Sequence, residues 1–117
     1  MISAIVGNKR TPLFLGMKAM NTITKKYGSL LGFQNVLKNT EDPDAQNEAI
    51  FFVAQAMNIN AAVMEKSSPS FDNAEEMEAF CMPHEYLPLF TAVTDAIKES
   101  TQVTVEAEIA GDNSKNT

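Results

Sequence analysis

The residues best suited to chemistry in this chain are one cysteine, one histidine and a short run of glutamates. Cys81 and His84 have the C-x-x-H spacing found in zinc sites, but the sequence holds no other Cys or His. A closed zinc site normally takes four ligands, most of them Cys or His, so we interpret Cys81 as a buried thiol beside a helix break. The pair is also poorly arranged as nucleophile and base, because Pro83 separates them and no third group orients the histidine.

The glutamates at positions 75, 76 and 78 crowd one short predicted helix, which is the usual pattern of a solvated helix face. The chain contains no glycine-rich phosphate loop, no HExxH zinc motif and no GxSxG nucleophile turn. The sequence therefore predicts no catalytic residue, no metal site and no cofactor. We expect the protein not to be an enzyme.

The composition is that of an ordinary folded domain. Of the 117 residues, 44% are hydrophobic and 21% are charged, which suffices for one core without disulfides or metal. A single cysteine fits a reducing compartment. No apolar run has the length of a bilayer span or the form of a signal peptide. We expect one domain over residues 1–100 and a cytoplasmic location with no membrane contact.

Charge is divided unevenly along the chain. Residues 1–40 carry six Lys and Arg and no Asp or Glu, whereas residues 41–117 carry three basic and fifteen acidic side chains. This asymmetry favours head-to-tail association that weakens with salt. An equally good interpretation is that the opposite charges interleave across one folded surface.

The N-terminal forty residues predict a β-hairpin followed by two helices. Apolar alternation, the turn residues Gly7-Asn8-Lys9 and a return through Leu15 indicate a hairpin over residues 2–15, with Pro12 on an edge strand. The period then becomes helical over residues 17–27, which end at a glycine, and again over residues 29–37.

The segment 43–66 predicts the most informative helix, since Asp42 and Pro43 form a strong start signal. Its apolar residues cover roughly 220° at 3.6 residues per turn. Either this helix is central to the domain or one apolar stripe binds a partner. The stripe formed by Phe52, Ile59 and Val63 is the candidate partner surface. Phe51, which falls among polar residues, is a further candidate, and we expect it to be exposed.

Two more helices are expected, over residues 73–81 with a capping box at Asp72 and Glu75, and over residues 85–100. Residues 103–109 alternate as in a strand, which would pair with the hairpin or await a partner's edge, and the rest of 101–117 reads as a flexible tail. The fold class predicted is mainly α: a small domain of four to five helices preceded by a β-hairpin, with a short C-terminal strand.

The order of these segments resembles a known family. GMKAMNTITKKYG (residues 16–28), AIFFVAQAMNINAAVMEK (49–66), FDNAEEMEAF (71–80) and EYLPLFTAVTDAIKES (85–100) follow one another as similar phrases do in the tail assembly chaperones of long-tailed bacteriophages of Gram-positive hosts or related prophages. The resemblance covers about residues 10–100. Residues 80–83 and the segment VTVEAEI depart from the family pattern.

The resemblance implies a non-enzymatic, largely helical protein of the host cytoplasm that binds the tape measure protein and keeps it soluble during virion assembly. It also implies recruitment of the tail tube protein and self-association as a homo-oligomer. Together with the charge pattern, it adds Lys18 and Lys25 to the candidate partner-binding residues. The alternative is a small nucleic-acid-associated regulator that uses the basic N-terminal forty residues, although a net charge of −6 argues against nucleic-acid binding.

Overall fold

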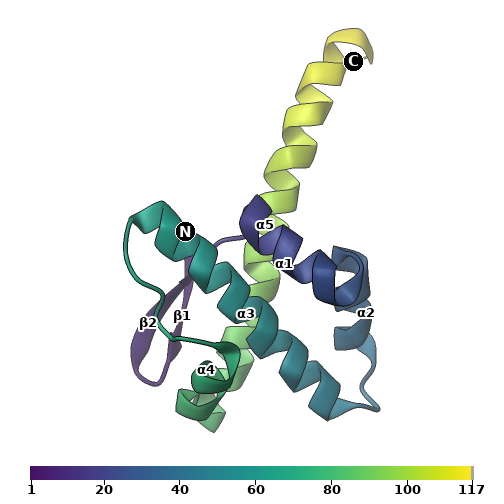
Figure 1. Cartoon of the computed structure of the whole chain (residues 1–117). Coiled ribbons are helices and arrows are strands. Elements are labelled where there is room, and N and C mark those ends of the chain that lie inside the picture. Colours follow the sequence, from purple (N-terminus) through teal and green to yellow (C-terminus); the bar gives the residue numbers. More distant parts are fainter. Residues whose placement is uncertain (117) are drawn as a thin grey trace.

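The computed structural model describes residues 1–116, with side chains placed for residues 1–101. Over this range an antiparallel hairpin precedes five helices, so the predicted mainly α fold is confirmed (Figure 1). The elements are β1 (Ile2–Val6), β2 (Lys9–Leu13), α1 (Met17–Tyr27), α2 (Leu30–Lys38), α3 (Pro43–Glu65), α4 (Ala74–Phe80) and α5 (Pro83–Asn116).

The hairpin forms around a two-residue turn at Gly7 and Asn8, whose φ angles are +58° and +62°. Glycine and asparagine tolerate this left-handed conformation better than other residues, and it matches the twist of the two strands. Pro12 lies on an edge strand, as expected, because β2 pairs only with β1. Proline has no backbone N–H, and an edge strand tolerates this because one of its sides has no neighbouring strand. The cross-strand pairs are Ile2–Leu13, Ser3–Pro12, Ala4–Thr11, Ile5–Arg10 and Val6–Lys9.

Helix α3 is the centre of the domain. It crosses the molecule diagonally in Figure 1 and contacts β2 and all the other helices. Internal packing therefore explains most of the apolar surface of α3. This agrees with the first interpretation of the sequence, in which the helix is central to the domain. The fully buried large apolar side chains of the core come from α3 itself, from every other helix and from both strands: Val6, Leu13, Ile23, Phe33, Ile50, Val53, Met57, Met77, Leu89 and Val93.

Local capping accounts for most helix boundaries. The Asp42 carboxylate accepts a hydrogen bond from the Ala45 N–H at 3.1 Å, which starts α3 where the sequence predicts. The start of α4 differs by one residue, because Asn73 is the cap and accepts from the Glu76 N–H at 2.8 Å. The predicted capping box at Asp72 and Glu75 is therefore wrong in register.

The predicted C-terminal strand is also wrong. Helix α5 begins two residues before the expected start at 85 and continues without a break to Asn116, through the alternating residues 103–109. Extending an existing helix requires no new nucleation, whereas a strand needs a partner edge for its backbone hydrogen bonds. The upper half of α5 extends beyond the rest of the molecule in Figure 1.

Candidate protein-binding surface

Phe51 does not lie at the surface. Only 6% of it is exposed, and its ring centroid is 5.9 Å from that of Tyr86 on α5. The expectation that Phe51 is exposed is therefore wrong. Polar residues on that side of α3 are covered too, since Gln55 donates to the Phe71 carbonyl and Asn58 to the Pro12 carbonyl. Polarity in the sequence therefore does not identify the solvent-exposed side of this helix.

Phe52 is half-buried and has its contacts within the chain. Its ring meets Tyr27 of α1 edge-on with centroids 5.9 Å apart, and the Lys26 ammonium lies 5.1 Å from its centroid. The same ammonium is 3.5 Å from a carboxylate oxygen of Glu48. A cation over an aromatic ring contributes about 0.5–1 kcal/mol at an exposed site. This cluster joins α1 to α3 and leaves Phe52 little area for a partner.

The other two members of the predicted stripe, Ile59 and Val63, lie one turn apart near the end of α3. Ile59 is half-buried, whereas 59% of Val63 is exposed, and the adjacent Met64 is similarly exposed. Met17, at the start of α1, is 72% exposed. We call these four residues (Met17, Ile59, Val63, Met64) the α3 C-terminal surface.

A buried amide brings the start of α1 to this end of α3. The Asn60 Oδ1 atom accepts hydrogen bonds from the N–H groups of Gly16 and Ala19, each at 3.0 Å. These are donors that a helix start leaves without partners in its own helix. A Cβ at Gly16 would come within 2.8 Å of the same oxygen, so any larger residue there would have to displace the Asn60 amide. Met17 is thereby held beside the last two turns of α3.

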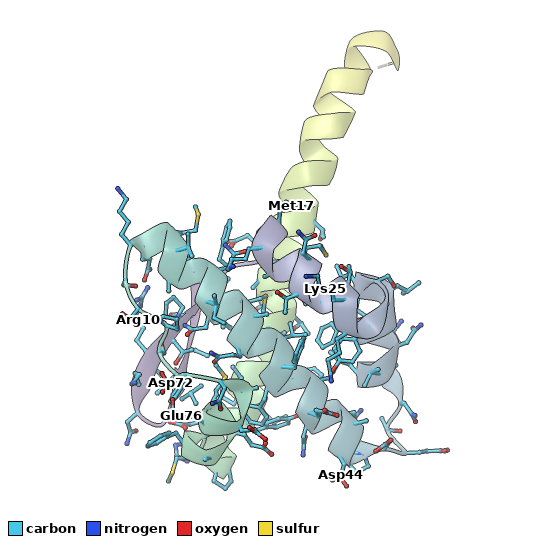
Figure 2. All side chains as sticks on the ribbon, in the orientation of Figure 1. Arg10, Met17, Lys25, Asp44, Asp72 and Glu76 are labelled. Atoms are coloured by element: carbon cyan, nitrogen blue, oxygen red, sulfur yellow. The ribbon has the colours of Figure 1, made fainter. Side chains whose placement is uncertain are left out.

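The two predicted lysines are both exposed but lie apart. Lys18 directly follows Met17, the first residue of α1, whereas Lys25 lies in the last turn of the helix, away from Met17 in Figure 2. Among the described residues, neither takes part in an ion pair. Lys18 is thus next to the exposed Met17 in the chain, and Lys25 is not.

Other basic residues of the N-terminal forty are engaged by later segments. Arg10 pairs with Glu65 at 3.1 Å, and the Lys9 ammonium donates to the Ser70 carbonyl at 2.7 Å and lies over the Phe71 ring. With Lys26 on Glu48, these contacts show that the opposite charges interleave across part of the folded surface. Exposed pairs of this kind add little stability, about 0–1 kcal/mol each.

Three buried amides on α3 were missed by the sequence analysis. Besides Asn60, the Asn58 side chain donates to the Pro12 carbonyl at 2.9 Å and accepts from the Ser70 N–H at 2.7 Å. Gln55 donates to the Phe71 carbonyl at 2.8 Å. Together they join the hairpin and the segment before α4 to the central helix. The available signal was that these three amides interrupt the segment 49–64 of α3, whose other residues are all apolar.

Glu85 connects the hairpin turn to the start of α5. Its carboxylate accepts from the N–H groups of Met82 at 2.8 Å, Gly7 at 2.7 Å and Asn8 at 3.1 Å. The hydrogen bond from Met82, with those from Gly7 and Asn8, lowers the pKa of Glu85 despite the opposing effect of desolvation. This carboxylate is the single buried acid in the part of the chain with placed side chains.

The thiol of Cys81 is less reactive than that of an exposed cysteine. Partial burial, with a smaller contribution from the Glu85 charge, raises the pKa of its thiol, which lowers the fraction of reactive thiolate. Among the described residues, no three His, Cys, Asp or Glu side chains come together as a metal site would need. Nor does any helix in the described part of the chain combine the length and the apolar character that crossing a membrane requires.

The hairpin and the helices packed around α3 define a small mainly α domain whose exposed apolar surface is the best candidate site. No protein-family model matches the chain, and neither a curated protein nor a solved structure matches it.

Proposed function

We propose that the chain is a tail assembly chaperone of a long-tailed bacteriophage. In this role it binds the tape measure protein in the host cytoplasm, keeps it soluble and helps to recruit tail tube subunits. Two things support the proposal: the order of the sequence phrases over residues 10–100, and the apolar side chains left exposed where α1 meets α3. The α3 C-terminal surface is the observation that carries it.

This surface has the properties expected of a site for an apolar helix. From Ala49 to Ala62 nearly every α3 side chain is buried, yet the next two, Val63 and Met64, are exposed beside Met17. Methionine side chains are flexible and adapt to varied apolar partners. An amphipathic helix of a long client would cover these residues, and Lys18 is placed to meet an acidic residue on its flank.

The alternative function, nucleic-acid binding by the N-terminal forty residues, receives no such support. Lys9, Arg10 and Lys26 are engaged with later parts of the chain. The basic side chains that remain are spread along α1 and the end of α2 and do not form a continuous stripe, which phosphate-backbone recognition uses.

The proposal is tested by co-expression with the tape measure protein of the same genome, which the proposal requires to be a long reading frame with coiled-coil patterning. We expect the long protein to be soluble and to co-purify with the wild-type chain. The variant Val63→Asp/Met64→Asp should lose both effects, since two carboxylates would face the client's apolar stripe. Leu31→Asp, at an equally exposed position on α2, is the matched control and should behave as the wild type.

The result that overturns the proposal is an insoluble long protein in the presence of folded wild-type chain. Loss of binding in Leu31→Asp with full binding in Val63→Asp/Met64→Asp would instead overturn the assignment of the surface. Circular dichroism of each purified variant shows that the substitution has not unfolded the chain.

A further inference from the structure

Strand β1 has an outer edge whose backbone groups are left unpaired. Val6 and Lys9 flank the two-residue turn, so they form a hydrogen-bonded pair, and such pairs alternate with unbonded ones along the ladder. The N–H and C=O groups of Ser3 and Ile5 therefore point away from β2. Within the described part of the chain, no other group forms a hydrogen bond with them.

The opposite edge of the hairpin is covered. The C=O group of Pro12 accepts a hydrogen bond from the Asn58 amide at 2.9 Å, and that of Arg10 accepts one from the Ser70 hydroxyl at 3.5 Å. These bonds show that alternate residues of β2 point their backbone groups away from β1. Pro12 pairs with Ser3 and has no N–H, which agrees with an unbonded pair at this position. The hairpin thus has one covered edge and one open edge.

The open edge lacks the usual protection against a further strand. Charged residues, proline or a covering element normally prevent an edge from pairing with another chain. Strand β2, with the sequence KRTPL, has two charges and a proline, whereas β1, with the sequence ISAIV, has neither. Ile5 is 51% exposed, and Met1 just before the strand is 53% exposed. An apolar edge with unpaired backbone groups is a template for an added strand.

A trough runs beside this edge, between β1 and the first turns of α5. It consists of two adjoining hollows of about 700 and 390 Å³, which share Ser3 and Pro88 in their linings. Residues three or four positions apart lie on one face of a helix. The α5 side of the trough is such a row of exposed residues: His84, Leu87, Pro88, Thr91 and Asp95. We call this feature the β1–α5 trough.

The bonding and the lining of the trough specify an extended backbone. A strand turns alternate side chains to opposite faces, so one set would lie against Leu87 and Thr91 and the other beside Ile5. Leu87 is 72% exposed, which favours apolar side chains in the first set. Asp95, at the Met1 end, takes part in no ion pair among the described residues. A lysine or arginine of the ligand would complement it.

We propose that the β1–α5 trough binds an extended segment of another protein, which adds to β1 as a third strand. The segment is about as long as β1, contains no proline, and carries apolar side chains at alternate positions and a lysine or arginine next to Asp95. Because this site takes a strand and the α3 C-terminal surface takes a helix, the inference does not rest on the proposed function.

The chain's own described segments do not fill this place. The sheet has two strands, and α5 continues as a helix beyond the rest of the molecule (Figure 1). Strand β1 of a second copy would bring its own α5 towards the α5 that borders the trough. A segment without attached elements meets no such obstacle, which favours it as the occupant.

The first test is selection of a displayed library of random peptides on the immobilised full chain. Enriched peptides should carry alternating apolar residues without proline, and a lysine or arginine. Ile5→Lys should bind them at least about tenfold more weakly, because a charge at the edge disfavours strand pairing. Thr91→Trp, which fills the trough from α5, should have the same effect. Leu31→Lys, at a similarly exposed apolar position on α2, is the matched control and should bind as the wild type.

Circular dichroism of each variant shows that it remains folded. Absence of enrichment on the wild type would overturn the proposal. So would enriched peptides that bind Ile5→Lys and Thr91→Trp as well as they bind the wild type. Asp95→Lys should remove the preference for a basic residue, and an unchanged preference would overturn the role of Asp95.

Amide hydrogen exchange, followed residue by residue by NMR, tests the pairing itself. In the free chain the amides of Ala4 and Val6 should exchange slowly and those of Ser3 and Ile5 quickly, since only the first two bond to β2. An enriched peptide should slow the Ser3 and Ile5 amides by at least about tenfold. Binding that leaves both amides fast would overturn the proposal.

One further outcome would assign the edge differently. If the Ser3 and Ile5 amides become slow without peptide as the protein concentration rises, a second copy occupies the edge and the proposal is overturned. Neither experiment includes the helical client. A negative result here therefore leaves the co-expression test unaffected, and failure of that test leaves this site unaffected.

Discussion

At the scale of single residues, Asn60 does most to place the exposed apolar surface. Its side-chain oxygen satisfies two N–H groups at the start of α1, and Asn60→Ala would leave both without a partner in a buried place. We expect the free energy of unfolding to fall by about 1–3 kcal/mol, measured by urea denaturation. Asn21→Ala, on the exposed side of α1, is the control and should change it by less than about 0.5 kcal/mol. Equal effects of the two substitutions would contradict this role for Asn60.

The lowered pKa of Glu85 makes the stability of the fold depend on pH. Its pKa is lowered in the folded chain by the N–H groups of Met82, Gly7 and Asn8, relative to an ordinary value of about 4.5. A lowered pKa contributes stability that is fully present above the ordinary value and is lost as the pH falls through the folded value. Thermal unfolding should therefore show a falling midpoint below about pH 4.5. In Glu85→Gln the midpoint should be lower at neutral pH and should change less on acidification. An unchanged acid dependence in this variant would contradict the assignment.

The structural role of a residue was predictable where the groups it contacts are close to it in the sequence. The Asp42 cap and the Gly7-Asn8 turn depend on neighbours within a few positions, and both were predicted. Asn58 and Asn60 bond to groups more than forty residues earlier in the chain, in β2 and at the start of α1. A polar residue at helical spacing predicts a solvated face, so these two buried amides could not be identified without the tertiary structure.

At the scale of elements, the account depends on α3 being buried along most of its length and exposed at its last turn. Two methionines on the helix provide a matched comparison, since Met57 is fully buried and Met64 is exposed. Met57→Ala should lower the free energy of unfolding by about 2–5 kcal/mol, because it leaves a cavity between packed elements. Met64→Ala should change it by less than about 0.5 kcal/mol. Chemical denaturation of both variants measures the difference, and similar losses would show that the end of α3 is covered.

The positions of the helices in the sequence were largely predictable. Which elements pack against each other was not. Helical spacing and capping residues located α1, α2 and α3 to within about one residue. The alternating residues 103–109 were wrongly predicted as a strand, because so short an alternation can also occur within a helix and because α5 continues from the residues before them. Which helix covers which face of α3 depends on the whole packing, which explains the wrong expectation for Phe51.

At the scale of the whole molecule, folding brings part of the basic charge of the N-terminal forty residues next to acidic residues from later in the sequence. Arg10 with Glu65 and Lys26 with Glu48 each join a basic early segment to an acidic later one. Among the described residues, Lys18, Lys25, Lys38 and Lys98 take part in no ion pair, so part of the basic charge is not matched by neighbouring carboxylates.

The central claim is that the α3 C-terminal surface binds an apolar helical client. NMR signals of the methionine methyl groups, followed during titration with helical fragments of the tape measure protein that we propose as the client, test this binding. The account predicts that the signals of the exposed Met17 and Met64 shift first, while those of the buried Met57 and Met77 stay in place. Titration that shifts neither exposed methionine, or that shifts only the signals of buried methionines, would contradict it.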